Sequence, residues 1–257
     1  MIAVLTSSPA YRVAIAGLPL STQNAASGSE AEAIVVIDGA AGWTTRAARA
    51  ADQGAAAIVV ADPQSGRLDE LALRALAARL PVVLDRPHLR RDVVADALAG
   101  EPARSAPWAF VTAHCSAPAG VLSETLTDAL GWLREIAGPL ELTVSRGAGE
   151  GVLASLRGAR GGVSLTVRRL GGAGPRISVT AVAPRRLEVT LAPGALPAVR
   201  WTDAVGASTP PARFENRERL SLRRAVSAIE SNELLSDVHD YLADASIAAE
   251  LRQAMPT

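Results

Sequence analysis

Two stretches decide the fold of this chain: Ile34-Val35-Val36-Ile37, and Ala57-Ile58-Val59-Val60-Ala61, which runs on into Asp62-Pro63. Both are continuous apolar runs rich in β-branched residues, and an Ala- and Arg-rich helical pattern lies between them at residues 44–53. Strands of this kind, separated by helices, are typical of a parallel sheet that is buried on both faces. The sequence therefore predicts a doubly wound α/β sheet in this region.

The same pattern extends in both directions along the first hundred residues. It predicts further strands at residues 2–5, 13–16 and 82–84 and further helices at 68–80 and 90–98. The polar stretch at 24–32 indicates a loop, and the stretch at 101–107 indicates a linker.

After residue 107 the spacing of apolar residues changes, and from residue 140 onward apolar and polar residues alternate. A strand at 108–113 and a helix at 122–136, closed by Gly138-Pro139, come first. Alternating segments follow at 140–145, 152–156, 163–168, 177–182 and 187–191. They predict an antiparallel meander with one open face. Helices are expected at 218–230 and at 236–253, the latter capped at Ser236 and Asp237.

The expected fold class is thus α/β followed by α+β. A truncated Rossmann-like domain with a parallel sheet is expected at residues 1–106. A domain with an open, mainly antiparallel sheet is expected at residues 107–257.

Composition excludes several classes of protein. The 257 residues carry a formal net charge of zero and are 49% hydrophobic, which is too apolar for a disordered chain and too little basic for a nucleic-acid binder. The single cysteine, Cys115, allows no disulfide within the chain. No apolar run approaches the roughly 20 residues that span a bilayer, and Met1–Thr6 has no charged n-region. We therefore expect a cytoplasmic protein with neither nucleic acid nor membrane as partner.

The chain contains no lysine, and all 26 of its basic residues are arginine. Because arginine stays protonated in proteins, a Schiff base or a proton-donating amine on a lysine side chain is excluded.

The order of these segments resembles the Gfo/Idh/MocA oxidoreductase family of sugar and inositol dehydrogenases. Residues 31–37 are similar to the fourth strand of that family, and Ala57–Pro63 to the fifth strand, which ends there in Glu-Lys-Pro. Leu80–Leu84 with Arg90–Val93 resembles the sixth strand and the start of the next helix. Residues 120–138 resemble the helix with the catalytic carboxylate and histidine, and residues 221–230 the closing helices.

The resemblance implies hydride transfer with a nicotinamide cofactor, but this sequence departs from the family at the positions that carry it. The lysine position holds Asp62, the aspartate position holds Glu124, and the histidine position holds Asp128. Asp85-Arg86-Pro87 is a second candidate for the Glu-Lys-Pro motif, but its spacing from Ile34–Ile37 is too long.

The glycine-rich turn that lets a backbone approach a pyrophosphate is also missing. No G-x-G-x-x-G precedes residue 34, and the nearest stretch, Val13–Pro19, has one glycine and a proline. No cofactor is therefore expected, although an active member of the family would bind NAD or NADP.

Most of the remaining candidate residues also have a plain structural interpretation. Asp62 before a proline fits a turn, and Glu124 and Asp128 near a helix start stabilise its dipole. His114 and Cys115 are adjacent, so on a strand they point to opposite faces. His88 and His239 stand apart, and two arginine pairs, Arg90-Arg91 and Arg185-Arg186, are either anion ligands or solvated.

Three hypotheses follow from these residues. The first is a non-catalytic subunit that forms a homo-oligomer, or a hetero-oligomer with an intact paralogous dehydrogenase, through the C-terminal sheet. The second is an active NAD(P)-dependent sugar or polyol oxidoreductase whose site is completed differently. The third is a cofactor-free sugar-binding or lyase-type protein with Glu124 and Asp128 as acid and base.

Overall fold

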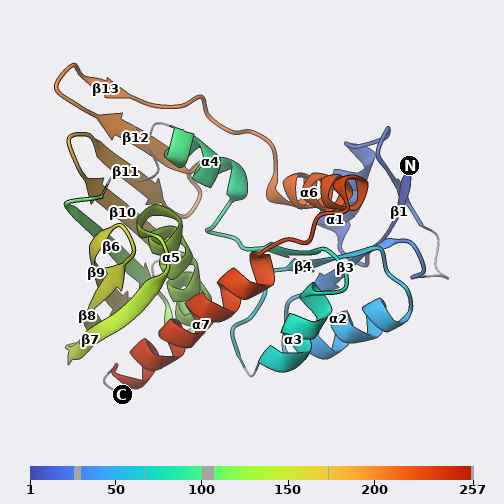
Figure 1. The fold of residues 1–257 in the computed structure, drawn as a ribbon, viewed down its shortest axis with the longest axis horizontal. Coiled ribbons are helices and arrows are strands. Elements are labelled where there is room, and N and C mark those ends of the chain that lie inside the picture. Colours follow the sequence, from blue (N-terminus) through green and yellow to red (C-terminus); the bar gives the residue numbers. More distant parts are fainter. Residues whose placement is uncertain (26–29, 67, 100–106, 173, 256–257) are drawn as a thin grey trace. The chain divides into compact units, whose positions relative to one another are not determined.

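The computed structural model describes residues 1–25, 30–66, 68–99, 107–172 and 174–255 (Figure 1). Contacts divide the chain into two compact units. The first comprises Met1–Pro87 and Phe214–Leu242, and the second comprises His88–Arg213 and Ala243–Thr257. These limits differ from the two consecutive ranges expected above, because the chain returns to the first unit after residue 213.

The first unit contains a parallel sheet of five strands in the order β2-β1-β3-β4-β5. The strands are β1 (Ile2–Leu5), β2 (Thr22–Asn24), β3 (Ile34–Asp38), β4 (Ala57–Ala61) and β5 (Val82–Asp85). The helices that follow strands are α1 (Pro9–Ala16), α2 (Trp43–Asp52) and α3 (Glu70–Ala77). The central strands are buried on both faces, which is why their sequences are continuously apolar.

The expected strand at residues 13–16 is wrong, since these residues end α1. Pro9 stands in the first turn of this helix, where its missing N–H costs nothing, and Tyr11, Ala14 and Ile15 form its buried face at helical spacing. The second strand is instead Thr22–Asn24, a short polar edge strand that the apolar pattern could not reveal.

Two helices from the end of the chain complete the first unit. They are α6 (Arg217–Ser231) and the first residues of α7 (Asp237–Gln253). Leu222, Ala225 and Val226 of α6 pack with α1 and one face of the sheet. Val238, Tyr241 and Leu242 of α7 pack with α2, α3 and the other face.

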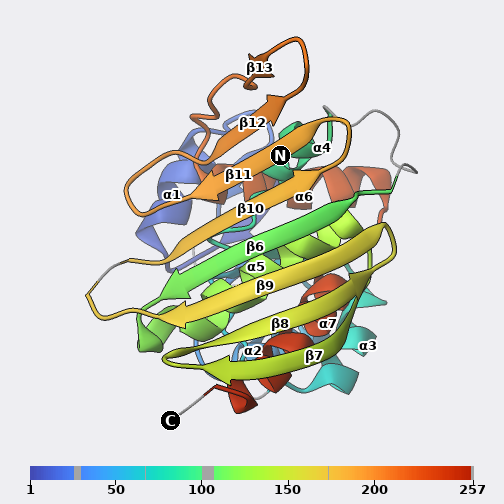
Figure 2. The same ribbon diagram turned by 90° about the vertical axis from the view of Figure 1, so that its left-hand side faces the viewer.

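The second unit is built on an eight-stranded sheet in the order β13-β12-β11-β10-β6-β9-β8-β7, shown face-on in Figure 2. Its pairs are antiparallel except for β6 with β9, so the sheet is mainly antiparallel, as predicted. The strands are β6 (Phe110–Ala117), β7 (Leu140–Ala148), β8 (Gly151–Gly158), β9 (Gly161–Arg169), β10 (Arg176–Val182), β11 (Arg186–Leu191), β12 (Ala198–Thr202) and β13 (Ala207–Ser208).

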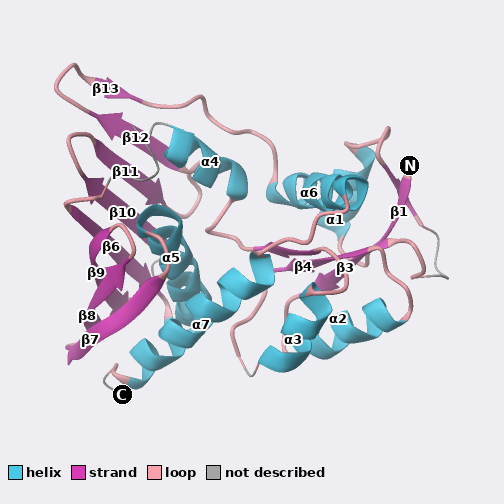
Figure 3. Cartoon of the chain, viewed as in Figure 1, coloured by secondary structure: helices cyan, strands magenta, loops and turns pink. Residues whose placement is uncertain are grey.

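One face of this sheet is covered by α5 (Leu122–Ala137), which follows the short η1 (Ala119–Val121), and α4 (Arg91–Ala99) also contributes to this core (Figure 3). Helix α5 ends at Gly138, whose φ of 81° is a conformation that side chains disfavour. A Cβ there would also lie 2.9 Å from the Cβ of Ala159, so the Gly-Pro stop has a steric reason.

The structure therefore confirms the fold class: a Rossmann-like parallel sheet and a mainly antiparallel, one-side-open sheet in the same chain. The expected linker at 101–107 lies almost wholly outside the described residues, as does part of the expected loop at 24–32. Among the residues that the structure describes, no helix is both long enough and apolar enough to cross a bilayer.

Candidate functional site

The carboxyl edge of the parallel sheet is where open α/β folds bind ligands, and here it carries two aspartates. Asp62 directly follows β4, and Asp85 is the last residue of the neighbouring β5. Asp62 has a left-handed backbone with φ of 52°. Gly39, after β3, packs so closely on this backbone that a Cβ would lie 2.3 Å from the Asp62 carbonyl oxygen. The strand ends are therefore held in one tight arrangement.

Asp62, the residue at the lysine position implied by the resemblance, is bound by an arginine from α6. The Nη1 and Nη2 atoms of Arg217 donate to Oδ1 and Oδ2 of Asp62 at 2.5 and 2.7 Å. This two-point geometry is the strong form of an arginine–carboxylate pair. The carboxylate thus has a fixed internal partner.

Asp85 is buried and accepts a hydrogen bond of 2.6 Å from the hydroxyl of Tyr11 on α1. Burial raises the pKa of the Asp85 carboxyl, although Arg217 and the Tyr11 hydroxyl oppose this shift. Burial and the charge of Asp85 also raise the pKa of the Tyr11 hydroxyl. The tyrosine therefore stays a neutral donor rather than a base.

Arg217 is the centre of this cluster. Its Nε lies 3.4 Å from a carboxylate oxygen of Glu218 and 3.9 Å from Oδ2 of Asp85. Burial lowers the pKa of the guanidinium, but the hydrogen bond with Asp62 and the charges of Asp85, Asp62 and Glu218 raise it overall. The guanidinium is thus surrounded by three acids, which leaves it poorly suited to capture an anionic substrate.

Sequence reasoning missed most of this cluster. Asp85 was considered only as a rival motif position, and Tyr11, Arg217 and Glu218 come from segments far apart in the chain. The available signal was the position of Asp85 and Asp62 after two buried parallel strands, since the ends of such strands meet at one edge.

Glu124 and Asp128 lie on α5 in the second unit, whereas Asp62 belongs to the first. Asp128 is buried, and its Oδ2 accepts the backbone N–H of His88 at 2.9 Å. The His88 carbonyl accepts a 2.7 Å bond from Nε1 of Trp132, which lies one turn further along the same helix. Asp128 therefore anchors the chain that enters α4. Glu124 stands in the first turn of α5, where an acid stabilises the helix dipole.

The turn after β1 does not fit a nicotinamide dinucleotide held in the usual way. Thr6, Ser7 and Ser8 all carry side chains where glycines would let a pyrophosphate approach. The N–H of Ser8 donates to Oγ1 of Thr6 at 3.1 Å, and Pro9 has no N–H to offer. Asn24, at the end of β2, replaces the acid that holds a ribose.

A hollow of about 370 Å³ does lie between the carboxyl ends of β1 and β3, and Thr6, Ser7, Asp38 and Arg46 are among its lining residues. Arg46 donates to the carbonyl oxygens of Asp38, Ala40 and Ala41 at 2.8–2.9 Å. Its guanidinium therefore stabilises the turn before α2.

The other candidates have structural partners or inert surroundings. Cys115 faces the core, and burial raises the pKa of its thiol to about 12, while His114 faces the open side of the sheet. Arg90 pairs with Asp92, Arg91 with Glu135, Arg185 with Asp203, and Arg186 with Glu188. His239 contacts Arg74 through Nδ1 at 2.9 Å. No cluster of three metal-binding side chains occurs among the described residues.

Comparison with known proteins finds likeness in structure only. No protein-family model matches the sequence, and no curated protein matches it. Solved structures match over almost the whole length of both chains. The dehydrogenase MviM from Clostridium difficile gives a TM-score of 0.71 at 8% identity, with 98% of each chain covered.

Two further structures give similar scores. The UDP-N-acetylglucosamine 3-dehydrogenase GnnA from Acidithiobacillus ferrooxidans matches with a TM-score of 0.69 at 14% identity, covering 99% of this chain and 97% of its own. The 3-ketoreductase KijD10 from Actinomadura kijaniata, solved with NADP, matches with 0.66 at 17% identity and the same coverage. The fold of this chain is therefore that of the two-domain Gfo/Idh/MocA-type dehydrogenases.

Proposed function

We propose that this chain is a non-catalytic protein on a sugar-dehydrogenase fold, acting as a structural or regulatory subunit beside an active NAD(P)-dependent enzyme. The observation that carries the proposal is the pair between Asp62 and Arg217. At the position where the family has a lysine, this chain has a carboxylate whose two oxygens are held by one guanidinium. The carboxylate of Asp62 and the guanidinium that is bound to it do not replace the lysine ammonium that contacts a substrate hydroxyl.

The turn after β1 supports the same proposal. A pyrophosphate is bound by free backbone N–H groups at a helix N-terminus, and here the N–H of Ser8 already has an internal acceptor. Asp128 supports it as well, because one of its oxygens is used to hold the backbone of His88. The departures from the family at Asp62, at Asp128 and in the turn after β1 thus each coincide with a contact that stabilises this chain.

Titration of the purified chain with NADPH and with NADH, followed by calorimetry, tests the proposal. We expect no saturable binding at millimolar cofactor and no reduction of NAD or NADP with sugar substrates. KijD10, which binds NADP in its crystal structure, serves as the positive control. Micromolar binding, or turnover by the chain alone, would overturn the proposal.

A second candidate is an active oxidoreductase whose site is completed by another chain. The likeness to KijD10, which was solved with NADP, favours it. In that case reduction of NAD or NADP appears only after a partner chain is added, and it is lost in Asp62→Asn. A partner that is equally active with and without this chain would exclude it.

We also propose that the assembly surface is the open face of the eight-stranded sheet and that the protein is cytoplasmic. The exposed apolar residues of the open face, which include Phe110 and Leu153, support its choice as the assembly surface. Co-purification with an intact dehydrogenase chain, abolished by Leu153→Asp, is the expected result. Co-purification that survives this substitution would place the surface elsewhere.

A further inference from the structure

The open face of the eight-stranded sheet has a regular composition that its register makes explicit. In one row of paired residues, Ser155, Ser164, Thr112, Thr180 and Glu188 lie side by side across five strands. In the next row, Leu153 pairs with Thr166, Thr166 with His114, and His114 with Ser178. Small hydroxyl side chains therefore cover the centre of this face.

This face carries an excess of positive charge, although the formal net charge of the whole chain is zero. The open-face positions of β6 to β12 carry two glutamates, Glu141 and Glu188, and six arginines. The arginines are Arg146, Arg157, Arg168, Arg176, Arg186 and Arg200. Both glutamates are already paired, with Arg157 at 3.4 Å and with Arg186 at 2.8 Å.

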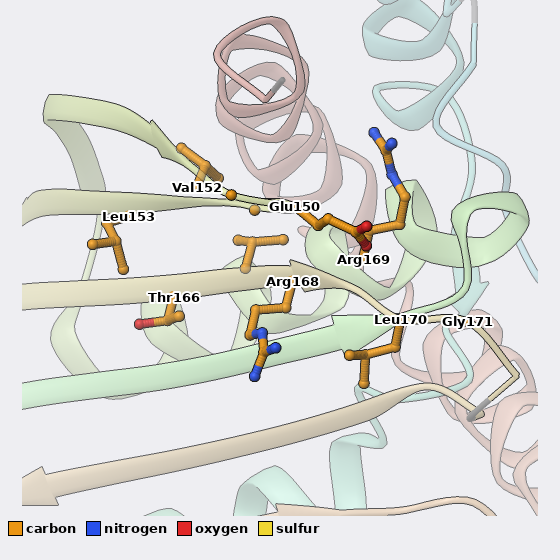
Figure 4. Close-up of a pocket in the computed structure, with 11 residues that line it drawn as sticks. Glu150, Val152, Leu153, Thr166, Arg168, Arg169, Leu170 and Gly171 are labelled. Carbon is orange, nitrogen blue, oxygen red and sulfur yellow. The ribbon is translucent and has the colours of Figure 1, made fainter. Parts of the chain in front are cut away.

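Four arginines on this face remain without a hydrogen-bonding or ionic partner among the described residues. They are Arg146, Arg168, Arg176 and Arg200, and all four are exposed. Arg168 and Arg176 flank Ser116 in one row. Arg168 also lines a hollow of about 370 Å³ at the start of β8 and the end of β9, where it points to the opposite side of β9 from Arg169 (Figure 4).

Exposed apolar side chains lie among these charges. Phe110, Val144, Leu153 and Val182 are 46%, 59%, 51% and 38% exposed and share this face. Aromatic residues and arginines are enriched at protein interfaces, and apolar residues within a charged surface favour a protein over a bare polyanion.

We propose that the open face of this sheet docks an acidic surface of a partner protein, and that its positive charge prevents two copies of this chain from pairing through it. The proposal rests on the assembly part of the proposed function and specifies the partner. A two-fold symmetric dimer places the same patch on both sides of the interface. Here that would bring four unneutralised arginines of each copy together, whereas an acidic face supplies their counter-charges.

A charge-reversed copy of the chain provides a defined acidic probe of the right shape. In this variant the four unpartnered arginines are replaced: Arg146→Glu, Arg168→Glu, Arg176→Glu and Arg200→Glu. All four are exposed, so the fold is expected to persist, which circular dichroism checks. Sedimentation at low salt is then measured for the wild type, for the variant and for an equimolar mixture.

The expected result is that each protein alone is a monomer and that the mixture forms a heterodimer. Because the attraction is electrostatic, raising the salt from about 50 to about 500 mM should weaken association by about tenfold or more. A control with four arginines reversed elsewhere, Arg12→Glu, Arg49→Glu, Arg74→Glu and Arg79→Glu, should stay monomeric when mixed with wild type.

Three outcomes would overturn the proposal. They are a wild-type dimer that Leu153→Asp dissociates, a mixture that stays monomeric at low salt, and tight binding of a short DNA duplex that the four face substitutions abolish. None of these measurements involves a cofactor. Binding of NADPH would overturn the non-catalytic role and leave this result unchanged, so the two failures are distinguishable.

Discussion

Arg217 is the first residue of α6, and its guanidinium donates hydrogen bonds to both carboxylate oxygens of Asp62, which follows β4. The same guanidinium lies 3.9 Å from the buried carboxylate of Asp85. These two aspartates differ in exposure, since the side chain of Asp62 is 53% exposed and that of Asp85 is 4% exposed. If the arginine is lost, water can therefore solvate the carboxylate of Asp62, but it cannot solvate the buried carboxylate of Asp85.

This difference predicts unequal costs for removing the partners. Asp62→Asn should lower the free energy of unfolding by no more than about 1 kcal/mol, because a half-exposed ion pair is well screened. Arg217→Met should cost about 2–4 kcal/mol, because it leaves Asp85 buried beside Glu218 without a cation. Urea unfolding of both variants measures this, with Arg219→Met as an exposed control. Equal losses would contradict the arrangement.

Asp85 makes stability depend on pH in a definite direction. Its pKa is raised in the folded state, so the folded chain binds more protons than the unfolded chain between the ordinary carboxyl pKa and the raised value. Stability must therefore fall as pH rises through that window, by about 1.4 kcal/mol for each unit of the shift. Asp85→Asn keeps an acceptor for Tyr11 and should remove this part of the dependence. Denaturant melts from acidic to neutral pH compare the two, and unchanged slopes would refute the prediction.

Cys115 should be unreactive in the folded chain. Its thiol is buried, and its pKa of about 12 leaves almost no thiolate at neutral pH. A disulfide reagent should label it only as fast as the second unit opens, and at once in denaturant. Fast labelling of the native chain would show that this side of β6 is accessible.

Asp128 is expected to act on stability. Asp128→Ala removes the acceptor of the His88 N–H and should cost about 1–3 kcal/mol, while Asp128→Asn should restore much of it. Glu124→Ala, on the same helix, should change the free energy of unfolding by less than about 0.5 kcal/mol. Thermal unfolding of the three variants gives the comparison. An alanine variant as stable as wild type would show that Asp128 has no anchoring role.

The parts of the fold that follow local periodicity could be predicted, and the parts that depend on distant contacts could not. The spacing of apolar residues predicts the buried strands β3, β4 and β5 and the alternating strands of the second unit. Strand β2 could not be found, because three polar residues at a sheet edge carry no apolar signal. The sequence predicts a strand at Val13–Ala16, the second half of helix α1, because this short apolar run fits both structures.

The site divides in the same way. Asp62 and Asp128 were identified from a resemblance between sequences, but their partners could not be. Arg217, the partner of Asp62, and Tyr11, the partner of Asp85, approach the strand ends only after α6 and α1 have packed on the sheet, so nothing in their local sequence marks them.

The return of the chain to its first unit constrains how the protein is made. The ribosome delivers the strands of the parallel sheet first, together with α1, α2 and α3, yet each face of that sheet still lacks one of its helices until residues 217–242 have emerged. The eight-stranded sheet and α5 are complete by residue 208. During synthesis the second unit can therefore form most of its core, apart from Ile247, Ala248 and Leu251, while the first unit still exposes the parts of its sheet that α6 and α7 later cover.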